Sequence, residues 1–477
     1  MMRFCLMLLL GLTTAFQTVG GAEKALAGSR PNIIFILTDD QGFADLGRNG
    51  NPVLKTPNLD RMYDQSRHFE DFHVSPSCSP TRASIMTGRH EFKNGVTHTI
   101  LERERLTLKA TTIVQLLKAA GYTTGIFGKW HLGDEDAYQP EKRGFDEVFI
   151  HGCGGIGQTY PGSCGDVPGN KYFSPTIKHN GKFEKTDGFC TDIFFAQATK
   201  WIEEVKGKQP FFCYIPTNAA HEPVSCPPKY EQPYSGKVIP DVAKFFGMIA
   251  NIDENVGKLR EKIKEWGIEN NTLVIFMNDN GGHPPATKVW NAGMRGTKIT
   301  AFNGGTRAMS LWCWPETIKP GACERLTAHL DMFPTFAELA GAKVPEEIAA
   351  KLDGFSLLPL LQSPQAAWHD ERLLFTHVGR WGGHKPGVEP EKYDGCSVRW
   401  QQYLQAYEKN GWRLYDLKAD PGEKSDVAVQ HPEVVTKLTA AYDAWWTEVL
   451  QCMDNEKAYL TAPKVNPYKE QYEKQFK

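Results

Sequence analysis

The sequence lacks an excess of charge, an internal hydrophobic run of membrane length and any Cys-x-x-Cys pair. Its 54 Lys and Arg residues nearly balance 56 Asp and Glu residues, and the formal charge of -2 argues against a broad basic surface for nucleic acid. No internal apolar run reaches about 18 residues, which excludes a polytopic membrane protein. Without a Cys-x-x-Cys pair, a structural zinc site is not expected. The 477 residues, 41% of them hydrophobic, indicate one large domain plus a smaller one, or two to three small ones.

The N-terminus has the layout of a secretory signal peptide. Arg3 precedes an apolar stretch over residues 4–16 that is too short to span a bilayer well, and small residues follow at 20–22 and again at 25–27. The alternative is an uncleaved membrane anchor. We therefore expect residues 1–28 to form a signal peptide. The mature protein is then secreted or periplasmic and is not an integral membrane protein.

Of the eleven cysteines, Cys5 lies in the expected signal peptide, and several of the remaining ten should pair in an oxidising compartment. Two plausible short-loop disulfides join Cys313 to Cys323 and Cys153 to Cys164. Spacing alone does not fix the connectivity.

Residues 31–365 alternate strand-like and helix-like segments, which is typical of an α/β fold with a large, mostly parallel sheet flanked by helices. The stretch 32–38 is continuously apolar, as expected for a strand buried on both faces. Strands are predicted at 32–38, 122–127, 211–215 and 272–277, and helices at 111–120, 191–205, 241–266 and 330–339.

From about residue 366 the pattern changes to short strands followed by one amphipathic helix. This predicts a small antiparallel sheet with a helix packed on it, so we expect a large α/β domain over 29–365 and a small α+β subdomain over 366–477. No structure is predicted for the polar tail from Asn455. The short strands are predicted at 372–378, 397–404 and 412–417, and the helix at 432–451.

Polar side chains follow two of the predicted buried strands. Asp39 and Asp40 come directly after the first strand, and Asp279 and Asn280 follow the strand at 272–277. Ligands bind beyond the carboxyl ends of strands in open α/β sheets, and carboxylate and amide oxygens suit Ca²⁺ or Mg²⁺ rather than zinc. Each segment alone is also ordinary turn chemistry. The two together predict a metal site.

Cys78 lies at the start of a predicted helix. Ser79 is a good N-cap, Pro80 suits the first helical position and Gly88 suits the exit. Backbone N–H groups and the helix dipole would then acidify the Cys78 thiol. One interpretation is a thiol nucleophile, which needs a His with an orienting Asn or Asp. Another is an ordinary helix start with a buried cysteine, and a third rests on a family resemblance.

The segment Cys78-Ser-Pro-Thr-Arg82, followed by Thr87-Gly88-Arg89, resembles the signature of type I sulfatases. In that family the Cys of a Cys-x-Pro-x-Arg motif is oxidised to formylglycine. The resemblance is closest to arylsulfatase A-like members and covers about residues 31–450. Further blocks that resemble the family, in the same order, are Asp39-Asp40, Gly128-Lys129-Trp130-His131-Leu132-Gly133, Asn218-Ala-Ala-His221, Asp279-Asn280-Gly281 and Arg295-Gly296-Thr297-Lys298.

The resemblance implies an alkaline-phosphatase-like fold and a sulfuric ester hydrolase that uses Ca²⁺ and a formylglycine made from Cys78. A hydroxyl of the hydrated aldehyde attacks sulfur, and the hemiacetal sulfate then collapses to release sulfate. A formylglycine-generating maturation enzyme is therefore an expected partner. Secretion suits an external sulfated saccharide as substrate, with aryl sulfates as surrogates. By the same resemblance, the Ca²⁺ ligands are Asp39, Asp40, Asp279, Asn280 and the modified Cys78.

The resemblance also gives roles to the cationic residues. Arg82 lies one helical turn beyond Cys78 and would steady the diol or the metal carboxylates. Lys129 and His131 share a face if the chain is extended there, and the family places them around the diol. Lys298 and His221 fall around the sulfate and the leaving group. Taken singly, each Lys could be a solvated surface charge and each His an ordinary loop residue.

Two departures from the family pattern and two rival functions remain. The chain has Asn303-Gly304-Gly305 where members usually carry Glu-Gly-Gly, and Asn278 where Ser is common; both bear on substrate preference. One rival is a phosphoryl hydrolase of the alkaline-phosphatase-like group, and the other is a non-catalytic protein that binds sulfated glycans. The substrate itself is not encoded in a motif. Candidate pocket loops are 151–190, 222–240, 283–296 and 379–396, with His151 and Gln158 as loop candidates.

Overall fold

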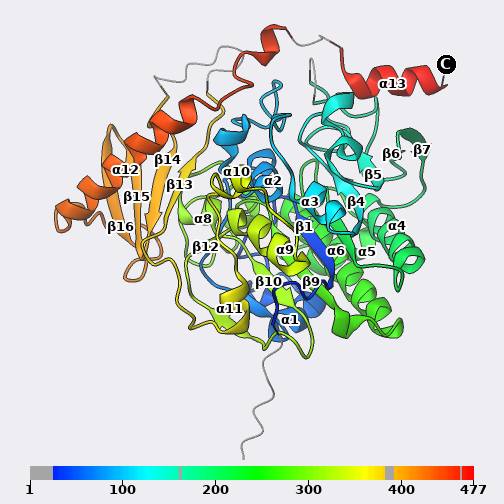
Figure 1. Cartoon of the computed structure of the whole chain (residues 1–477), viewed down its shortest axis with the longest axis horizontal. Coiled ribbons are helices and arrows are strands. Elements are labelled where there is room, and N and C mark those ends of the chain that lie inside the picture. Colours follow the sequence, from blue (N-terminus) through cyan, green and yellow to red (C-terminus); the bar gives the residue numbers. More distant parts are fainter. Residues whose placement is uncertain (1–24, 161–163, 382–390, 462–464, 477) are drawn as a thin grey trace, which may run out of the picture.

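A mixed ten-stranded sheet forms the centre of the molecule in the computed structural model, which describes residues 25–160, 164–381, 391–461 and 465–476 (Figure 1). Five adjacent strands at its centre run parallel, and on both sides the sheet continues through an antiparallel pairing. This confirms the α/β class with a more mixed sheet than expected. In spatial order the strands are β11 (Gly321–Cys323), β2 (Arg67–Phe69), β10 (Ser310–Cys313), β9 (Thr272–Asn278), β1 (Asn32–Thr38), β8 (Phe211–Pro216), β4 (Thr123–Lys129), β5 (Glu147–His151), β6 (Thr176–His179) and β7 (Lys182–Lys185).

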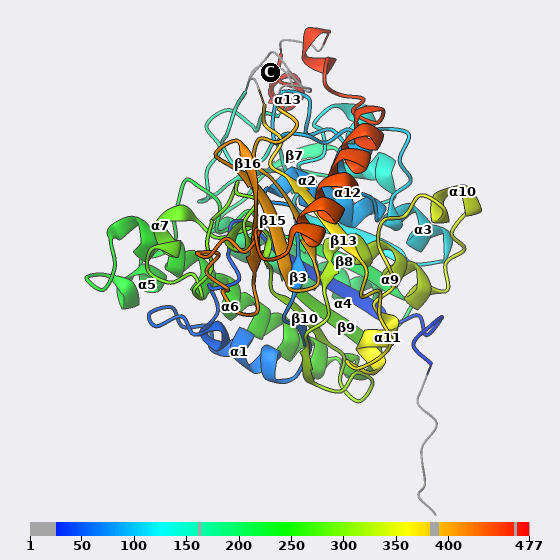
Figure 2. The same cartoon turned by 90° about the vertical axis from the view of Figure 1, so that its left-hand side faces the viewer.

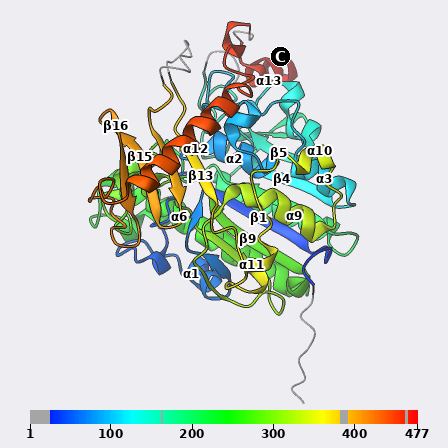
Figure 3. The same ribbon diagram turned by 60° about the vertical axis from the view of Figure 1, so that its left-hand side comes forward.

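Helices cover both faces of this sheet, so the side chains on both faces of β1 are buried and largely apolar. Ile33, Phe35 and Leu37 pack into one hydrophobic cluster, whereas Ile34 and Ile36 pack into a second cluster on the opposite face. Figure 3 shows α9 lying across the parallel strands. One face carries α2 (Cys78–Thr87), α3 (Ile113–Ala119) and α9 (Met332–Ala340), and the other carries α1 (Pro57–Asp64), α4 (Cys190–Val205) and α6 (Pro240–Glu265).

The C-terminal part forms the expected antiparallel sheet with one long helix packed on it (Figure 2). The predicted strand at 397–404 is wrong as a single element, because it spans a tight turn. Gln401 takes a positive φ of 49° there, and neither Gly nor Pro marks the turn in the sequence. The elements are β13 (Leu373–His377), β14 (Cys396–Trp400), β15 (Tyr403–Glu408), β16 (Gly411–Asp416) and α12 (Pro432–Leu450).

A last helix, α13 (Pro467–Phe476), was not predicted and returns to the far edge of the large sheet beside β7 (Figure 1). Its Tyr468 ring packs edge-on against Phe183 of β7. The side-chain amide of Gln475 accepts the N–H of Phe183 at 2.8 Å and donates to its carbonyl at 2.7 Å. The tail is polar and lacks the repeat of apolar residues that would have predicted this helix.

One of the two expected cysteine pairings is wrong. Cys313 packs into one hydrophobic cluster and Cys323 into the cluster on the opposite face of the sheet, so their side chains do not meet. Cys153 and Cys164, in contrast, face each other with their sulfurs 2.7 Å apart. Among the residues that the structure describes, no helix has both the length and the apolar character needed to cross a membrane. Most of the expected signal peptide, residues 1–24, lies outside the described residues.

Candidate active site

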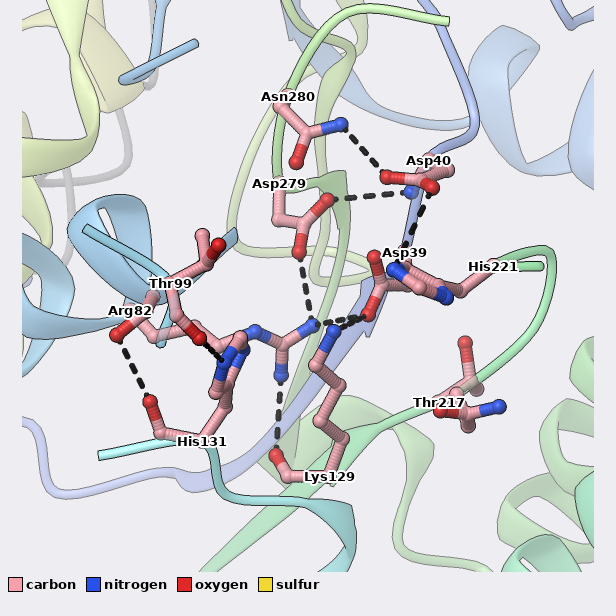
Figure 4. Close-up of polar contacts among 12 residues, drawn as sticks. Asp39, Asp40, Arg82, Thr99, Lys129, His131, Thr217, His221, Asp279 and Asn280 are labelled. Carbon is pink, nitrogen blue, oxygen red and sulfur yellow. Dashed lines mark hydrogen bonds and ion pairs between the residues drawn. The ribbon is translucent and has the colours of Figure 1, made fainter. Parts of the chain in front are cut away.

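The predicted site residues converge where four adjacent parallel strands end. β9, β1, β8 and β4 are neighbours in the sheet, and their carboxyl ends point to the same edge. Figure 4 shows the side chains that gather there. Asp279 and Asn280 follow β9, Asp39 and Asp40 follow β1, His221 lies beyond β8, and Lys129 ends β4.

Backbone hydrogen bonds hold the loops beyond these strands against one another. The Asp279 N–H donates to the carbonyl of Thr38 at 3.0 Å, which continues the pairing of β9 with β1 past the strand ends. The Gly42 loop crosses close to the Gly282 loop: a Cβ atom on Gly42 would lie 2.7 Å from the Gly282 Cα. A side chain at Gly42 would therefore push the two carboxylate-bearing loops apart.

The buried Arg82 guanidinium connects the carboxyl ends of β9, β1 and β4. It donates to Asp279 at 2.9 Å, to Asp39 at 3.3 Å and to the carbonyl of Lys129 at 3.0 Å. Arg82 is only 1% exposed. A buried guanidinium in this geometry fixes the separation of the two carboxylates, so the resemblance-based role of Arg82 beside the metal carboxylates agrees with its contacts.

Two lysines pair with the adjacent aspartates. Lys129 is fully buried and forms a close ion pair with Asp39. Lys298 comes from a separate loop and pairs with Asp40 at 2.7 Å, with its side chain 13% exposed. Lys298 therefore lies at the open side of the site, whereas Lys129 lies at its base.

Burial and charge act in opposite directions on the aspartates. Burial, followed by repulsion from Asp39, raises the pKa of Asp279 to about 7, although Arg82 and Lys129 oppose this. Burial would also raise the pKa of Asp40, but Lys298, His221 and Lys129 together hold that pKa well below its usual value. The Asp39 and Asp279 carboxylates thus repel each other in a way that a cation between them would relieve.

The donor set of this cluster fits a hard cation. Asp39 Oδ1 and Asn280 Oδ1 are buried and have no hydrogen-bond partner among the described residues. Ligand atoms of Asp39, Cys78 and Asp279 lie within 4.8 Å of one another. Carboxylate and amide oxygens suit Ca²⁺ or Mg²⁺. The residues predicted to hold the metal are therefore together, and two of their oxygens lack another partner.

Cys78 begins α2, as predicted, but two details of that prediction are wrong. The N-cap is Ser77 rather than Ser79, whose hydroxyl instead donates to the carbonyl of His131 at 2.9 Å. The thiol is not acidified: burial raises the pKa of Cys78, and Lys129 only partly opposes this. Desolvation outweighs the helix terminus here, which disfavours an unmodified thiolate as the nucleophile.

The two histidines present different nitrogens to the site. His221 Nδ1 donates to the carbonyl of Glu222 at 2.7 Å, so Nε2 faces Asp40 and can exchange a proton. His131 Nε2 donates to the carbonyl of Thr99 at 2.8 Å, which leaves Nδ1 buried without a partner among the described residues. Burial lowers the pKa of His221 to about 4, assisted by Lys298, and holds the pKa of His131 well below its usual value.

Some predicted details differ in the structure, and some partners were not predicted. His131 has a φ of +58°, so Lys129 and His131 are not joined by extended chain. His151 is 1% exposed and is a buried residue at the end of β5 rather than a pocket residue. The Thr99 carbonyl was missed because a backbone acceptor leaves no trace in sequence. Asn278 donates to the Asn280 carbonyl and accepts from Met309, which gives it a structural role.

Comparison with known proteins identifies the class of protein to which this fold and site belong. The Sulfatase family model matches residues 31–342. A second model, N-sulphoglucosamine sulphohydrolase, C-terminal, matches residues 298–444. The chain belongs to the sulfatase family, and it is a sulfuric ester hydrolase. The class expected from the Cys78 motif is thereby confirmed.

Individual relatives are similar in sequence to this chain over most of its length. Human arylsulfatase A is 31% identical over 456 residues, which span 86% of this chain and 86% of that protein. Human N-acetylgalactosamine-6-sulfatase is 29% identical over 460 residues, with 88% of this chain and 86% of that protein covered. The crystal structure of Ps i-CgsB superimposes with a TM-score of 0.77 at 29% identity, over 87% of this chain and 93% of that one. Ps i-CgsB has also been solved in complex with k-i-k-neocarrahexaose, with a TM-score of 0.76 and 29% identity over 87% and 93% of the two chains.

Proposed function

We propose that this protein is a secreted or periplasmic sulfatase that hydrolyses sulfate monoesters of saccharides, using Ca²⁺ and a formylglycine made from Cys78. The observation that carries the proposal is a pair of buried oxygens, Asp39 Oδ1 and Asn280 Oδ1, that have no hydrogen-bond partner among the described residues. Asp39 lies in one cluster with Asp279 and the Cys78 side chain, and the Asn280 amide donates to Asp40 beside it at 3.0 Å. A hard cation and an oxygen nucleophile at the Cys78 position would together complete this cluster.

The metal ligands in this proposal are Asp39, Asp40, Asp279, Asn280 and the modified Cys78. Bound Ca²⁺ supplies charge that polarises a sulfate oxygen and orients the nucleophile. Arg82 keeps Asp39 and Asp279 at a fixed separation through its hydrogen bonds. This leaves the metal carboxylates ordered before the substrate arrives.

The remaining residues act on the nucleophile and the substrate. Lys129 and His131 lie at the base of the site, where the unpartnered His131 Nδ1 can accept a proton from the nucleophilic hydroxyl. Lys298 lies at the open side, where its ammonium offsets charge on the sulfate oxygens. His221 Nε2 faces the same side, and the protonated form of His221 can donate a proton to the leaving alkoxide.

A cavity bordered by Glu222, the residue that follows His221, favours a saccharide as substrate. It has a volume of about 470 Å³ and is lined by the polar side chains of Gln158, Glu222, Asp241 and Lys244 together with Pro223 and Val224. Such a lining offers hydrogen-bond donors and acceptors suited to sugar hydroxyls. The complex of Ps i-CgsB with k-i-k-neocarrahexaose, at 29% identity, points to the same substrate class.

Secretion and the maturation enzyme are inferred from the sequence, and one contact bears on the cleavage point. Leu26 packs into the hydrophobic core, and the Gly28 N–H donates to the carbonyl of Glu338 at 2.8 Å. A cut after Ala22 would keep Leu26 in the mature chain, whereas a cut after Ala27 would remove it. We therefore favour cleavage after Ala22, which shortens the signal peptide from the 1–28 expected from the sequence to 1–22, and N-terminal sequencing of the exported protein tests this.

The decisive experiment examines the modification and the substrate preference in one preparation. Peptide mass spectrometry should find an aldehyde in place of the Cys78 thiol, and Cys78→Ala should be inactive. The matured enzyme should have a higher kcat/KM for nitrophenyl sulfate than for nitrophenyl phosphate, because a phosphate monoester carries nearly two charges and a sulfate monoester one. Full activity with an unmodified thiol would refute the modification, and a preference for phosphate would favour the phosphohydrolase alternative.

A further inference from the structure

Cys153 and Cys164 lie directly against one of the proposed catalytic residues. Their sulfurs are 2.7 Å apart, and both residues are almost completely buried. The Cys164 sulfur also lies 4.0 Å from His131 Nε2 and 3.5 Å from the Thr99 carbonyl to which His131 donates. The pair is therefore in contact with the hydrogen bond that orients His131.

The backbone around the pair is tied to one buried carboxylate and to the His131 ring. Asp134 accepts the N–H of Cys153 at 3.1 Å and the N–H of Gly165 at 2.8 Å, so one side chain holds both cysteine segments. Gly154 packs so tightly that a Cβ atom there would lie 2.5 Å from His131 Cε1. Any movement of the Cys153 segment would change the surface on which the His131 ring rests.

We propose that Cys153 and Cys164 form a disulfide that positions His131, so that the catalytic efficiency depends on the oxidation of this pair. The two thiols release two protons and two electrons. The disulfide of a thiol–disulfide oxidoreductase accepts them and becomes a dithiol. The inference rests on the proposed role of His131, but the bond itself is independent of the reaction catalysed.

A metal-binding role for the two sulfurs is less consistent with their surroundings. Burial raises the pKa of both thiols, whereas metal ligation needs thiolates. Within the described residues, neither cysteine belongs to a group of three side chains that could hold a metal. The two sulfurs, facing each other, are suited to bond to each other.

The bond is tested on the protein as secreted, without reduction. Free thiols are alkylated, the protein is digested, and the peptides are identified by mass. One linked species containing both Cys153 and Cys164 is expected, and it should separate into two peptides after reduction. Recovery of both cysteines in alkylated form from fully active enzyme would overturn the proposal.

The positioning role is tested by kinetics. In the variant Cys153→Ser/Cys164→Ser, kcat for nitrophenyl sulfate should fall about ten-fold, because a small displacement of a catalytic group is costly. KM should change little, since Lys298 and His221 are untouched. Cys452→Ser, two residues beyond the end of α12, is the matched control and should behave as wild type.

Reduction of the folded wild-type enzyme provides a second test, whose main measurement does not depend on the double variant. Dithiothreitol should lower kcat of wild type and of Cys452→Ser in parallel with the appearance of the two thiols. The double variant should not respond, which controls for reaction of the reductant elsewhere in the protein. An unchanged kcat after complete reduction would overturn the positioning role, even if the bond is present.

Discussion

Glu423 connects the C-terminal part to the loop that carries Lys298, and its environment gives a quantitative prediction. The carboxylate is buried: Oε1 accepts the N–H of Asn303 at 2.7 Å, and Oε2 has no partner among the described residues. Asn303 begins the short helix α8 (Asn303–Thr306), whose Gly304 N–H donates to the carbonyl of Arg295 at 2.6 Å. A charge on Glu423 is therefore costly to the fold.

The size of this cost follows from the pKa. Burial raises the pKa of Glu423 to about 7, compared with 4.5 for an exposed glutamate. The native state therefore holds a proton that the unfolded state has lost, and stability falls as the pH rises from about 4.5 to about 7. At about 1.4 kcal/mol per pKa unit, wild type should lose about 2.5 kcal/mol of unfolding free energy between about pH 5 and pH 8 because of this residue.

Glu423→Gln removes the titration and keeps an oxygen to accept the N–H of Asn303. Urea unfolding gives the unfolding free energy of wild type and of the variant at each pH. The variant's value minus the wild-type value should be about 2.5 kcal/mol larger at pH 8 than at pH 5. Glu347→Gln, on an exposed part of the surface, is the control and should track wild type. If the curves for wild type and Glu423→Gln run parallel across this range, the reasoning is refuted.

Three further predictions concern the candidate site. Lys298→Ala should lower kcat/KM for nitrophenyl sulfate about 100-fold, because a cation at the sulfate is lost, whereas the exposed control Lys319→Ala should have no effect. Arg82→Met should lower the unfolding free energy of the metal-free protein by about 3–5 kcal/mol, because two buried carboxylates lose their partner. Added Ca²⁺ should recover part of this loss, and an unchanged urea midpoint would contradict the prediction. Chelation should abolish turnover and added Ca²⁺ should restore it, whereas stoichiometric zinc in the active enzyme would count against calcium.

The sequence predicted those parts of the site whose position depends on strand order. Asp39 and Asp279 come straight after continuous apolar strands, and parallel strands bring the residues at their carboxyl ends to a common edge. The long helix predicted at 241–266 is α6 at Pro240–Glu265, because its amphipathic pattern persists over many turns. Local periodicity and connectivity were sufficient for these elements.

The features that the sequence missed depend on contacts between distant segments. The helix terminus predicted an acidified Cys78, but burial among other elements decides its pKa. Spacing suggested a bond between Cys313 and Cys323, but the sheet places them on opposite faces. The turn at Gln401 and the polar helix α13 carry no composition signal. In each case the deciding interaction joins residues that no local pattern relates.

The amide of Gln475 has a consequence for solubility. An outermost strand presents unpaired N–H and C=O groups to which another chain can add a strand. By bonding both the N–H and the carbonyl of Phe183, Gln475 takes the place of one residue of such a strand, and α13 covers the surrounding surface. Protein shortened to residue 461 would expose β7. We expect it to associate edge to edge at concentrations where the full chain remains monodisperse.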